Sequence, residues 1–116
     1  MRRGKKRKFA RVKNQRKSLY KALATALIDH GRIRTTLAKA KSASSFVDKL
    51  VSKAKRGDLG IQRSLRQDIG DKATKKLVAE IGPKFKERNG GYTKVLRLGR
   101  RVSDGAEMAI LEFTNN

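Results

Sequence analysis

The chain has 116 residues and a formal net charge of +21, because 31 lysines and arginines stand against only 10 acidic residues. It contains no cysteine, which excludes disulfide bonds and thiolate metal sites. The longest apolar run, Ala22 to Ile28, is far shorter than the roughly 18 residues that cross a bilayer, so we expect no membrane span and a cytoplasmic protein. A charge of this size indicates a polyanionic partner, with nucleic acid first among the candidates.

The positive charge is concentrated in the amino-terminal half. Residues 1–56 carry 19 basic and 2 acidic residues (+17), whereas residues 57–116 carry 12 and 8 (+4), which together give +21. The start of the chain has no acid and too few apolar side chains to bury, so it needs a polyanion to become ordered; the alternative is a solubilising tail. We expect residues 1–13 to be a basic nucleic-acid-binding arm and residues 14–116 to be one globular domain. The candidates for phosphate contact at this end are Arg2, Arg3, Lys5, Lys6, Arg7, Lys8, Arg11, Lys13, Arg16 and Lys17.

An amphipathic helix is predicted from Gln15 to His30. Leu19, Leu23 and Leu27 recur at a spacing of four, which places them on one face, and Gly31 is expected to end the helix. The opposite face continues the basic surface with Arg16, Lys17 and Lys21.

The next five residues, Arg32 to Thr36, predict a short strand. Ile33 and Thr35 would lie on one side of it, and Arg32 and Arg34 on the other. Two arginines on one side suit a surface that contacts phosphates, although two solvated charges on an exposed strand are an equally good interpretation.

Three helical segments are predicted after this strand. Apolar residues at spacings of three and four run from Leu37 to Ala54 and indicate the longest helix. A short helix is expected over Asp58 to Ile69, and a further one over Lys72 to Ile81, which Gly82 and Pro83 would terminate.

The chain is predicted to close with a β-hairpin. Two runs rich in strand-forming residues, Tyr92 to Val102 and Ala106 to Phe113, flank an Asp104-Gly105 pair, which is a strong hairpin signal. Neither run alternates cleanly, so we expect helices to cover one face of the sheet and a partner to cover the other. The cations of this hairpin that are candidates for contact with a polyanionic partner are Lys94, Arg97, Arg100 and Arg101.

Together these elements predict an α+β fold in the order α-β-α-α-α-β-β. The helices are expected to pack on one side of a small three-stranded mixed sheet, with a basic amino-terminal extension.

Residues suited to catalysis are scarce. His30 is the only histidine, and it stands where a helix end favours a capping role; the acids lack the spacing of a metal site. The Asn89-Gly90-Gly91 segment lacks the lysine and hydroxyl of a phosphate-binding loop and is interpreted as a hinge whose backbone could also touch RNA phosphate. We therefore expect no catalytic residue, no metal, no cofactor and no small-molecule substrate.

Two groups of motifs resemble a known family. The run from Leu27 to Lys41 (LIDHGRIRTTLAKAK) is similar to the central signature of the bacterial ribosomal large-subunit protein L seventeen family. Three later segments follow the closing pattern of that family in order and spacing: Gly82 to Phe85 (GPKF), Gly90 to Arg101 (GGYTKVLRLGRR) and Asp104 to Ala109 (DGAEMA). The resemblance covers nearly the whole chain.

The resemblance implies a structural protein of the large ribosomal subunit. Such a protein would bind and cross-brace large-subunit ribosomal RNA near the peptide exit tunnel, beside neighbours such as protein L thirty-two, without catalysis. A nucleoid-associated DNA-binding protein is the alternative that shares the charge. Beyond the arm, the second and third groups of predicted RNA contacts are Arg32, Arg34, Lys39 and Lys41 near the strand, and Lys94, Arg97, Arg100 and Arg101 on the hairpin.

Overall fold

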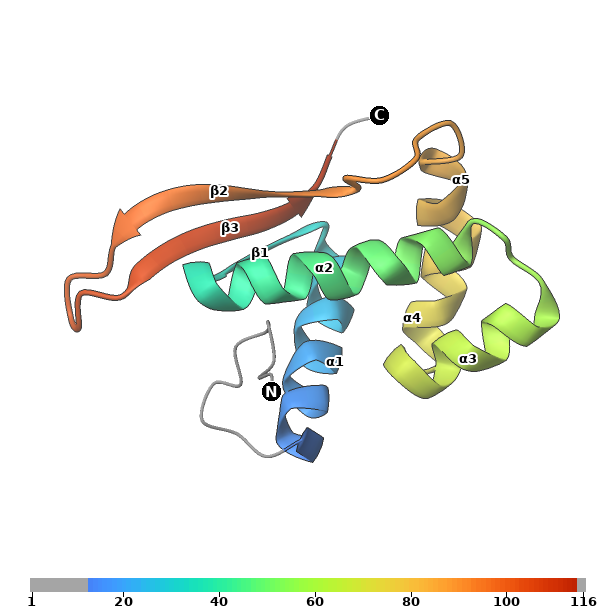
Figure 1. Cartoon of the computed structure of the whole chain (residues 1–116), viewed down its shortest axis with the longest axis horizontal. Coiled ribbons are helices and arrows are strands. Elements are labelled where there is room, and N and C mark those ends of the chain that lie inside the picture. The colour runs from blue at the N-terminus through green and yellow to red at the C-terminus, as the bar shows by residue number, and fades with distance from the viewer. Residues whose placement is uncertain (1–12, 115–116) are drawn as a thin grey trace, which may run out of the picture.

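A computed structural model describes the backbone of residues 13–114 and the side chains of residues 15–114 (Figure 1). The predicted arm, residues 1–13, lies outside the described residues except for Lys13, which begins the first helix. The described residues form an α+β fold in which a long hairpin and a short strand make a sheet and the helices pack beneath it.

Helix α1, Lys13–His30, begins slightly earlier than the sequence predicts and ends where predicted. Its apolar stripe buries Ala24, Leu27 and Ile28 in the core. At the end of the helix the Gly31 N–H donates to the Leu27 carbonyl at 2.7 Å, and Gly31 has φ +82°, a conformation that a residue with a Cβ adopts only with strain.

Strand β1, Arg32–Thr36, runs directly into helix α2, Leu37–Ala54. The Thr36 hydroxyl accepts a long 3.4 Å hydrogen bond from the Lys39 N–H and caps the helix. The predicted apolar stripe of α2 is confirmed as a buried face, and this helix touches all three strands as well as α1 and α3. Its buried residues are Leu37, Ala40, Ala43, Val47, Leu50, Val51 and Ala54.

The short helix predicted next is α3, Leu59–Ile69, and Asp58 caps it by accepting from the Ile61 N–H at 2.8 Å. A continuous helical segment then comprises α4, Asp71–Lys76, the π-helical turn η1, Leu77–Ile81, and α5, Gly82–Lys84.

The prediction that Gly82 and Pro83 terminate this segment is wrong, because the chain stays helical through Lys84. A Cβ at Gly82 would lie 3.3 Å from the carbonyl oxygens of both Ala54 and Leu77. The glycine therefore permits a close approach to the end of α2. The wider π-helical turn before it changes the spacing of the backbone hydrogen bonds just before Pro83, which has no N–H to donate.

The sheet has three strands in the order β1-β3-β2, with β2 at Thr93–Arg100 and β3 at Glu107–Phe113. Both pairings are antiparallel, so the prediction of a mixed sheet is wrong. The reason is that β1 pairs with the returning strand of the hairpin, which runs opposite to both of its neighbours. The predicted hairpin is confirmed, and α1 and α2 lie on one side of the sheet (Figure 1).

The apolar core lies between this side of the sheet and the helices. Phe85 is fully buried, and its ring centroid lies 5.4 Å from that of Tyr92 and 6.1 Å from that of Phe113. These contacts connect the end of α5 to the open end of the hairpin. Packing therefore fixes where the hairpin leaves the body of the protein.

Candidate nucleic-acid interface

Among the elements that the structure describes, no helix lies against one face of the sheet (Figure 1). Val95 and Leu111 are partners in register and pack against the core, so the residues one step along each strand point to the opposite side. We call that side the outer face. Its first row consists of Arg32, Glu112 and Lys94, and its second row consists of Arg34, Ile110 and Leu96.

In the first row a single carboxylate lies between two cations. Glu112 Oε1 is 3.3 Å from Arg32 Nη2, and Glu112 Oε2 is 3.2 Å from Lys94 Nζ. The Glu112 side chain is only 19 % exposed, whereas those of Arg32 and Lys94 are 61 % and 44 % exposed. Glu112 thus joins the two edge strands through the central one and leaves this row with a net charge of +1.

The second row combines a cation with two apolar side chains. Arg34 is exposed and forms no ion pair within residues 15–114, Leu96 is 41 % exposed, and Ile110 is half-buried. A single exposed leucine needs no explanation, but here it is part of an apolar strip beside an unpaired arginine. Leu98, which is 47 % exposed, follows in the β-bulge between Arg97 and Gly99.

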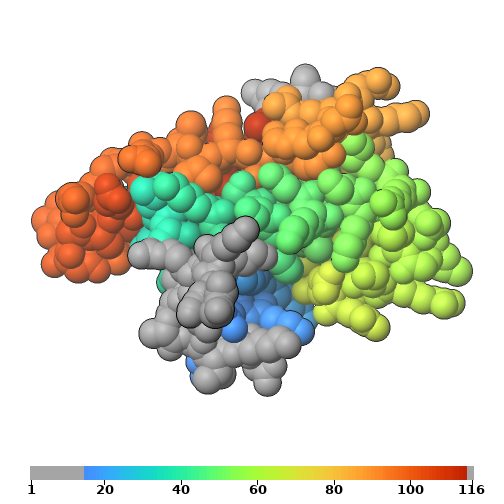
Figure 2. All heavy atoms as spheres, viewed as in Figure 1, coloured from blue at the N-terminus to red at the C-terminus, as the bar shows by residue number. Residues whose placement is uncertain are grey.

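The far part of the hairpin projects beyond the start of α2, as Figures 1 and 2 show. Arg97 and Arg100 are in register with Ala109 and Glu107, which places them on the helix side of the sheet. Both arginines are nevertheless exposed. They therefore form a cationic group separate from the outer face.

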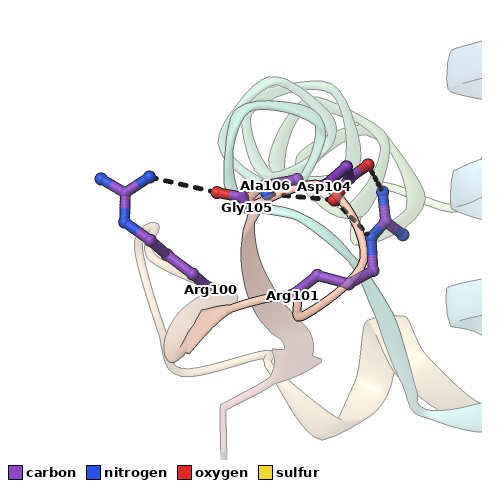
Figure 3. Close-up of polar contacts among 5 residues, drawn as sticks. All are labelled: Arg100, Arg101, Asp104, Gly105 and Ala106. Atoms are coloured by element: carbon purple, nitrogen blue, oxygen red, sulfur yellow. Dashed lines mark hydrogen bonds and ion pairs between the residues drawn. The ribbon is translucent and has the colours of Figure 1, made fainter.

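The loop that closes the hairpin holds its own ion pair (Figure 3). The Arg101 guanidinium meets the Asp104 carboxylate with two bonds, Nη2 to Oδ2 at 2.8 Å and Nε to Oδ1 at 3.0 Å. These bonds, together with one from the Ala106 N–H, lower the pKa of Asp104 to about 2, and the same pair raises the pKa of Arg101. Arg100 instead donates to the Gly105 carbonyl at 3.1 Å (Figure 3).

At its other end the hairpin is attached to α2 by a polar chain. Ser44 Oγ lies 2.6 Å from Thr93 Oγ1, and Thr93 Oγ1 donates to Asp48 Oδ1 at 3.0 Å. Burial raises the pKa of Asp48, although hydrogen bonds from Thr93 oppose that rise. Sequence reasoning missed these residues, because serine, threonine and a lone acid have no pattern that indicates a buried contact.

A second polar contact at the base of the hairpin involves Lys55. Its ammonium donates to the Arg88 carbonyl and, at 3.1 Å, to the Tyr92 hydroxyl, and it lies 5.1 Å from the Tyr92 ring centroid. The hydrogen bond from Lys55 lowers the pKa of Tyr92. This lysine therefore has a structural partner, in contrast to the exposed cations of the hairpin.

The remaining predicted cations lie on the helices and not on the outer face. Lys17 and Lys21 are exposed on α1, whereas Arg16 is half-buried there. On the first turn of α2 and just after it, Lys39 is half-buried and Lys41 is exposed. The structure thus brings Arg32, Arg34 and Lys94 together on one face and places the helix cations elsewhere, while the predicted contacts before Lys13 lie outside the described residues.

Two further observations concern other kinds of site. Within the part of the chain that the structure describes, no three histidine, cysteine or acidic side chains gather in a way that could hold a metal ion. Searched over the same residues, no helix has the length and apolar character needed to cross a membrane. His30 is exposed at the end of α1, where the sequence predicts a capping position.

A compact α+β body, a sheet with one uncovered face and a projecting cationic hairpin define a class of small, strongly basic proteins. Within that class, residues 19–114 match the family model described as "Ribosomal protein L17". This chain therefore belongs to the ribosomal protein L17 family.

Curated relatives agree with this assignment. The chain is 46 % identical over 108 residues to "Large ribosomal subunit protein bL17" of Campylobacter jejuni, an alignment that covers 92 % of both chains. Proteins of the same name from Campylobacter concisus and from a Sulfurihydrogenibium species are 47 % identical over 108 residues and 49 % identical over 111 residues. These alignments cover 92 % and 94 % of this chain and 92 % of each relative.

Proposed function

We propose that this protein is a structural constituent of the bacterial large ribosomal subunit that binds large-subunit ribosomal RNA and braces segments of it near the peptide exit tunnel. Family membership supports the ribosomal role, and the relatives carry names of large-subunit proteins. In this role the protein works in the cytoplasm as part of the ribosome, performs no catalysis and lies beside other large-subunit proteins, of which L thirty-two is the neighbour we propose.

The observation that carries this proposal is the distribution of charge. A net +17 in residues 1–56 against +4 in residues 57–116 concentrates cations at one end of the chain. In the folded part, acidic side chains pair with some cations, while Arg34 and Arg97 form no ion pair with a described residue. Phosphate contacts by such cations release counterions and give affinity without reading sequence.

We assign two parts to this function. Residues 1–13 act as an arm that lies between RNA segments and neutralises phosphates that would otherwise repel one another. Residues 14–116 form the domain that docks on RNA through its shape and through the exposed cations of β1, α1, α2 and the hairpin. Two separated cationic groups in one small protein suit the bracing of two RNA segments.

Deletion of residues 2–13 tests this function. The variant should retain the circular dichroism of the helices and the sheet, because the deletion removes only Lys13, the first residue of α1, from the elements that the structure describes. It should enter large subunits inefficiently, and wild-type protein should stay with the large subunit after a high-salt wash. Incorporation of the shortened chain at the wild-type level would overturn the role of the arm. Preference for duplex DNA over ribosomal RNA at equal salt would favour a DNA-binding function.

A further inference from the structure

We propose that the outer face of the sheet binds unpaired RNA nucleotides, with Leu96 and Ile110 beneath a base or ribose and the Arg34 guanidinium stacked beside them. This inference rests on the proposed function and extends it. It assigns RNA contact to two apolar residues and a specific kind of RNA structure to one face of the protein.

The charge of the outer face favours RNA as its occupant. Its only carboxylate in the first two rows, Glu112, is already paired with Arg32 and Lys94. Arg34 has no ion-pair partner among the described residues, so the two rows together carry a net charge of +2. A polyanion complements such a surface, whereas a second copy of this chain would bring the same cations together.

The apolar strip favours unpaired nucleotides over a duplex. An RNA duplex presents phosphates and riboses to a protein and keeps the faces of its bases stacked inside the helix. Leu96 and Ile110 gain nothing against phosphates, but they can bury the face of a base that has left the stack. An arginine plane is also a platform on which unpaired bases stack, and Arg34 lies in the same row as Ile110 and Leu96.

The first row positions the cations around this strip. Glu112 contacts Arg32 on one edge strand and Lys94 on the other, at 3.3 Å and 3.2 Å. A residue two positions along a strand lies roughly 6.6 Å away, so these two cations border the apolar strip. They can therefore contact the phosphates that flank a base held over Leu96.

The experiment measures binding of the full-length protein to two RNAs at several salt concentrations. One RNA is a stem with an internal loop of unpaired nucleotides, and the other is the same stem fully paired. We expect wild-type protein to prefer the looped RNA. Leu96→Ala should weaken binding to the looped RNA by roughly threefold to tenfold without changing the salt slope, because an apolar contact releases no counterion.

Arg34→Lys tests the arginine plane separately from its charge. It should also reduce the preference for the looped RNA while it leaves the salt slope unchanged. Matched controls are Leu59→Ala, whose leucine is 61 % exposed on α3, and Arg63→Lys, whose arginine is exposed on the same helix. Both controls should bind each RNA like wild type. Circular dichroism melts of the variants verify that each one is folded.

Two outcomes would overturn this inference. In the first, wild-type protein binds the two RNAs equally well. In the second, the Leu96→Ala variant binds the looped RNA as tightly as wild-type protein does. If Leu96→Ala leaves the binding of both RNAs unchanged but weakens retention of the protein in assembled large subunits, the outer face binds another protein and the inference is wrong. Failure of the proposed function is a different result, since it would appear as loss of the wild-type protein from large subunits in a high-salt wash, or as preference for duplex DNA over ribosomal RNA at equal salt.

Discussion

Thr93 donates a hydrogen bond from its hydroxyl to the Asp48 carboxylate at 3.0 Å, and this contact joins the edge strand β2 to the middle of α2. Thr93 is 9 % exposed and Asp48 is half-buried, so the bond is partly shielded from water. The Ser44 hydroxyl lies 2.6 Å from the same threonine oxygen. Three polar side chains therefore satisfy one another where the hairpin leaves the core.

Thr93→Val should lower the free energy of unfolding by roughly 1–3 kcal/mol, because valine keeps the shape and the strand preference of threonine but leaves Asp48 without its donor. Urea denaturation measures the loss. Thr35→Val in β1 is the matched control, since Thr35 is half-buried and its hydroxyl has no hydrogen bond to a side chain or backbone group of residues 15–114. Equal stabilities of the two variants would show that the polar chain contributes nothing.

The pKa values of two aspartates are shifted in opposite directions. Burial raises the pKa of Asp48, whereas Arg101 holds the pKa of Asp104 at about 2. Asp104 therefore adds stability above its unfolded pKa, and this is lost as the pH falls through about 2. The contribution of Asp48 is present at low pH and is lost as the pH rises through its raised pKa.

Carbon-detected NMR of the side-chain carboxyl groups measures both titrations. We expect Asp48 to take up its proton first as the pH is lowered, and Asp104 to take up its proton much later. Arg101→Gln should return the pKa of Asp104 toward its ordinary value without affecting Asp48, because the two sites share no contact. Titration of Asp104 at the same pH in both proteins would contradict the paired geometry of the loop.

The ion pair of the loop also predicts unequal contributions from the hairpin arginines to RNA binding. Arg97 has no carboxylate partner among the described residues, whereas Arg101 is partly neutralised by Asp104. Arg97→Gln should reduce the slope of log affinity against log salt by about 1, and Arg101→Gln should reduce it by less. Asp104→Asn should strengthen binding, because it frees Arg101.

Salt-dependent binding to ribosomal RNA measures these three effects. Asp29→Asn is the control for a general change in net charge, because Asp29 is exposed at the end of α1 and its carboxylate forms no ion pair in the described part of the chain. If Asp29→Asn and Asp104→Asn strengthen binding equally, the geometry of the loop has no role beyond its charge.

Periodic features of the sequence were sufficient to predict most of the fold. The spacing of apolar residues from Leu37 to Ala54 defines the buried face of α2, and Asp104-Gly105 marks the hairpin. Features that depend on distant contacts were not predictable in this way. The antiparallel pairing of β1 with β3 and the role of Gly82 both depend on segments that meet only in the folded chain.

The candidate site likewise has some features that local sequence patterns predict and others that depend on contacts between distant segments. Alternation along a strand predicts that Arg32 and Arg34 share a side, and the structure places both on the outer face. Alternation does not reveal that Glu112 would lie between Arg32 and Lys94, because that contact needs the register of three strands. Net charge therefore predicts the class of partner, whereas the pairing of charges decides which cations are available to it.

Gly82 makes a second stability prediction. Gly82→Ala should destabilise the protein by roughly 1–3 kcal/mol, because the new methyl group would press on the carbonyl oxygens of Ala54 and Leu77 at 3.3 Å. Gly60→Ala in α3 is the matched helical control, since its nearest neighbour would be at 3.6 Å. That control should stabilise the protein by roughly 0.4–1 kcal/mol. Thermal or urea unfolding that shows both variants unchanged would contradict the close packing of α5 on α2.

Glu112 should limit the affinity of the outer face for RNA. Glu112→Gln removes the carboxylate that Arg32 and Lys94 share, so both cations become available to phosphates. We expect tighter binding to ribosomal RNA and a salt slope that is steeper by roughly 1 to 2. The free energy of unfolding should change by less than about 1 kcal/mol, since both cations are well exposed.

The control for this prediction is Glu107→Gln, which makes the same change in net charge on the same strand. Glu107 is exposed, and its carboxylate forms no ion pair within the described residues, so its removal frees no cation. Glu112→Gln should therefore strengthen RNA binding more than Glu107→Gln at every salt concentration. If the two variants bind RNA with equal affinity, the ion pairs with Glu112 do not limit RNA binding by Arg32 and Lys94, and those two cations lie outside the interface.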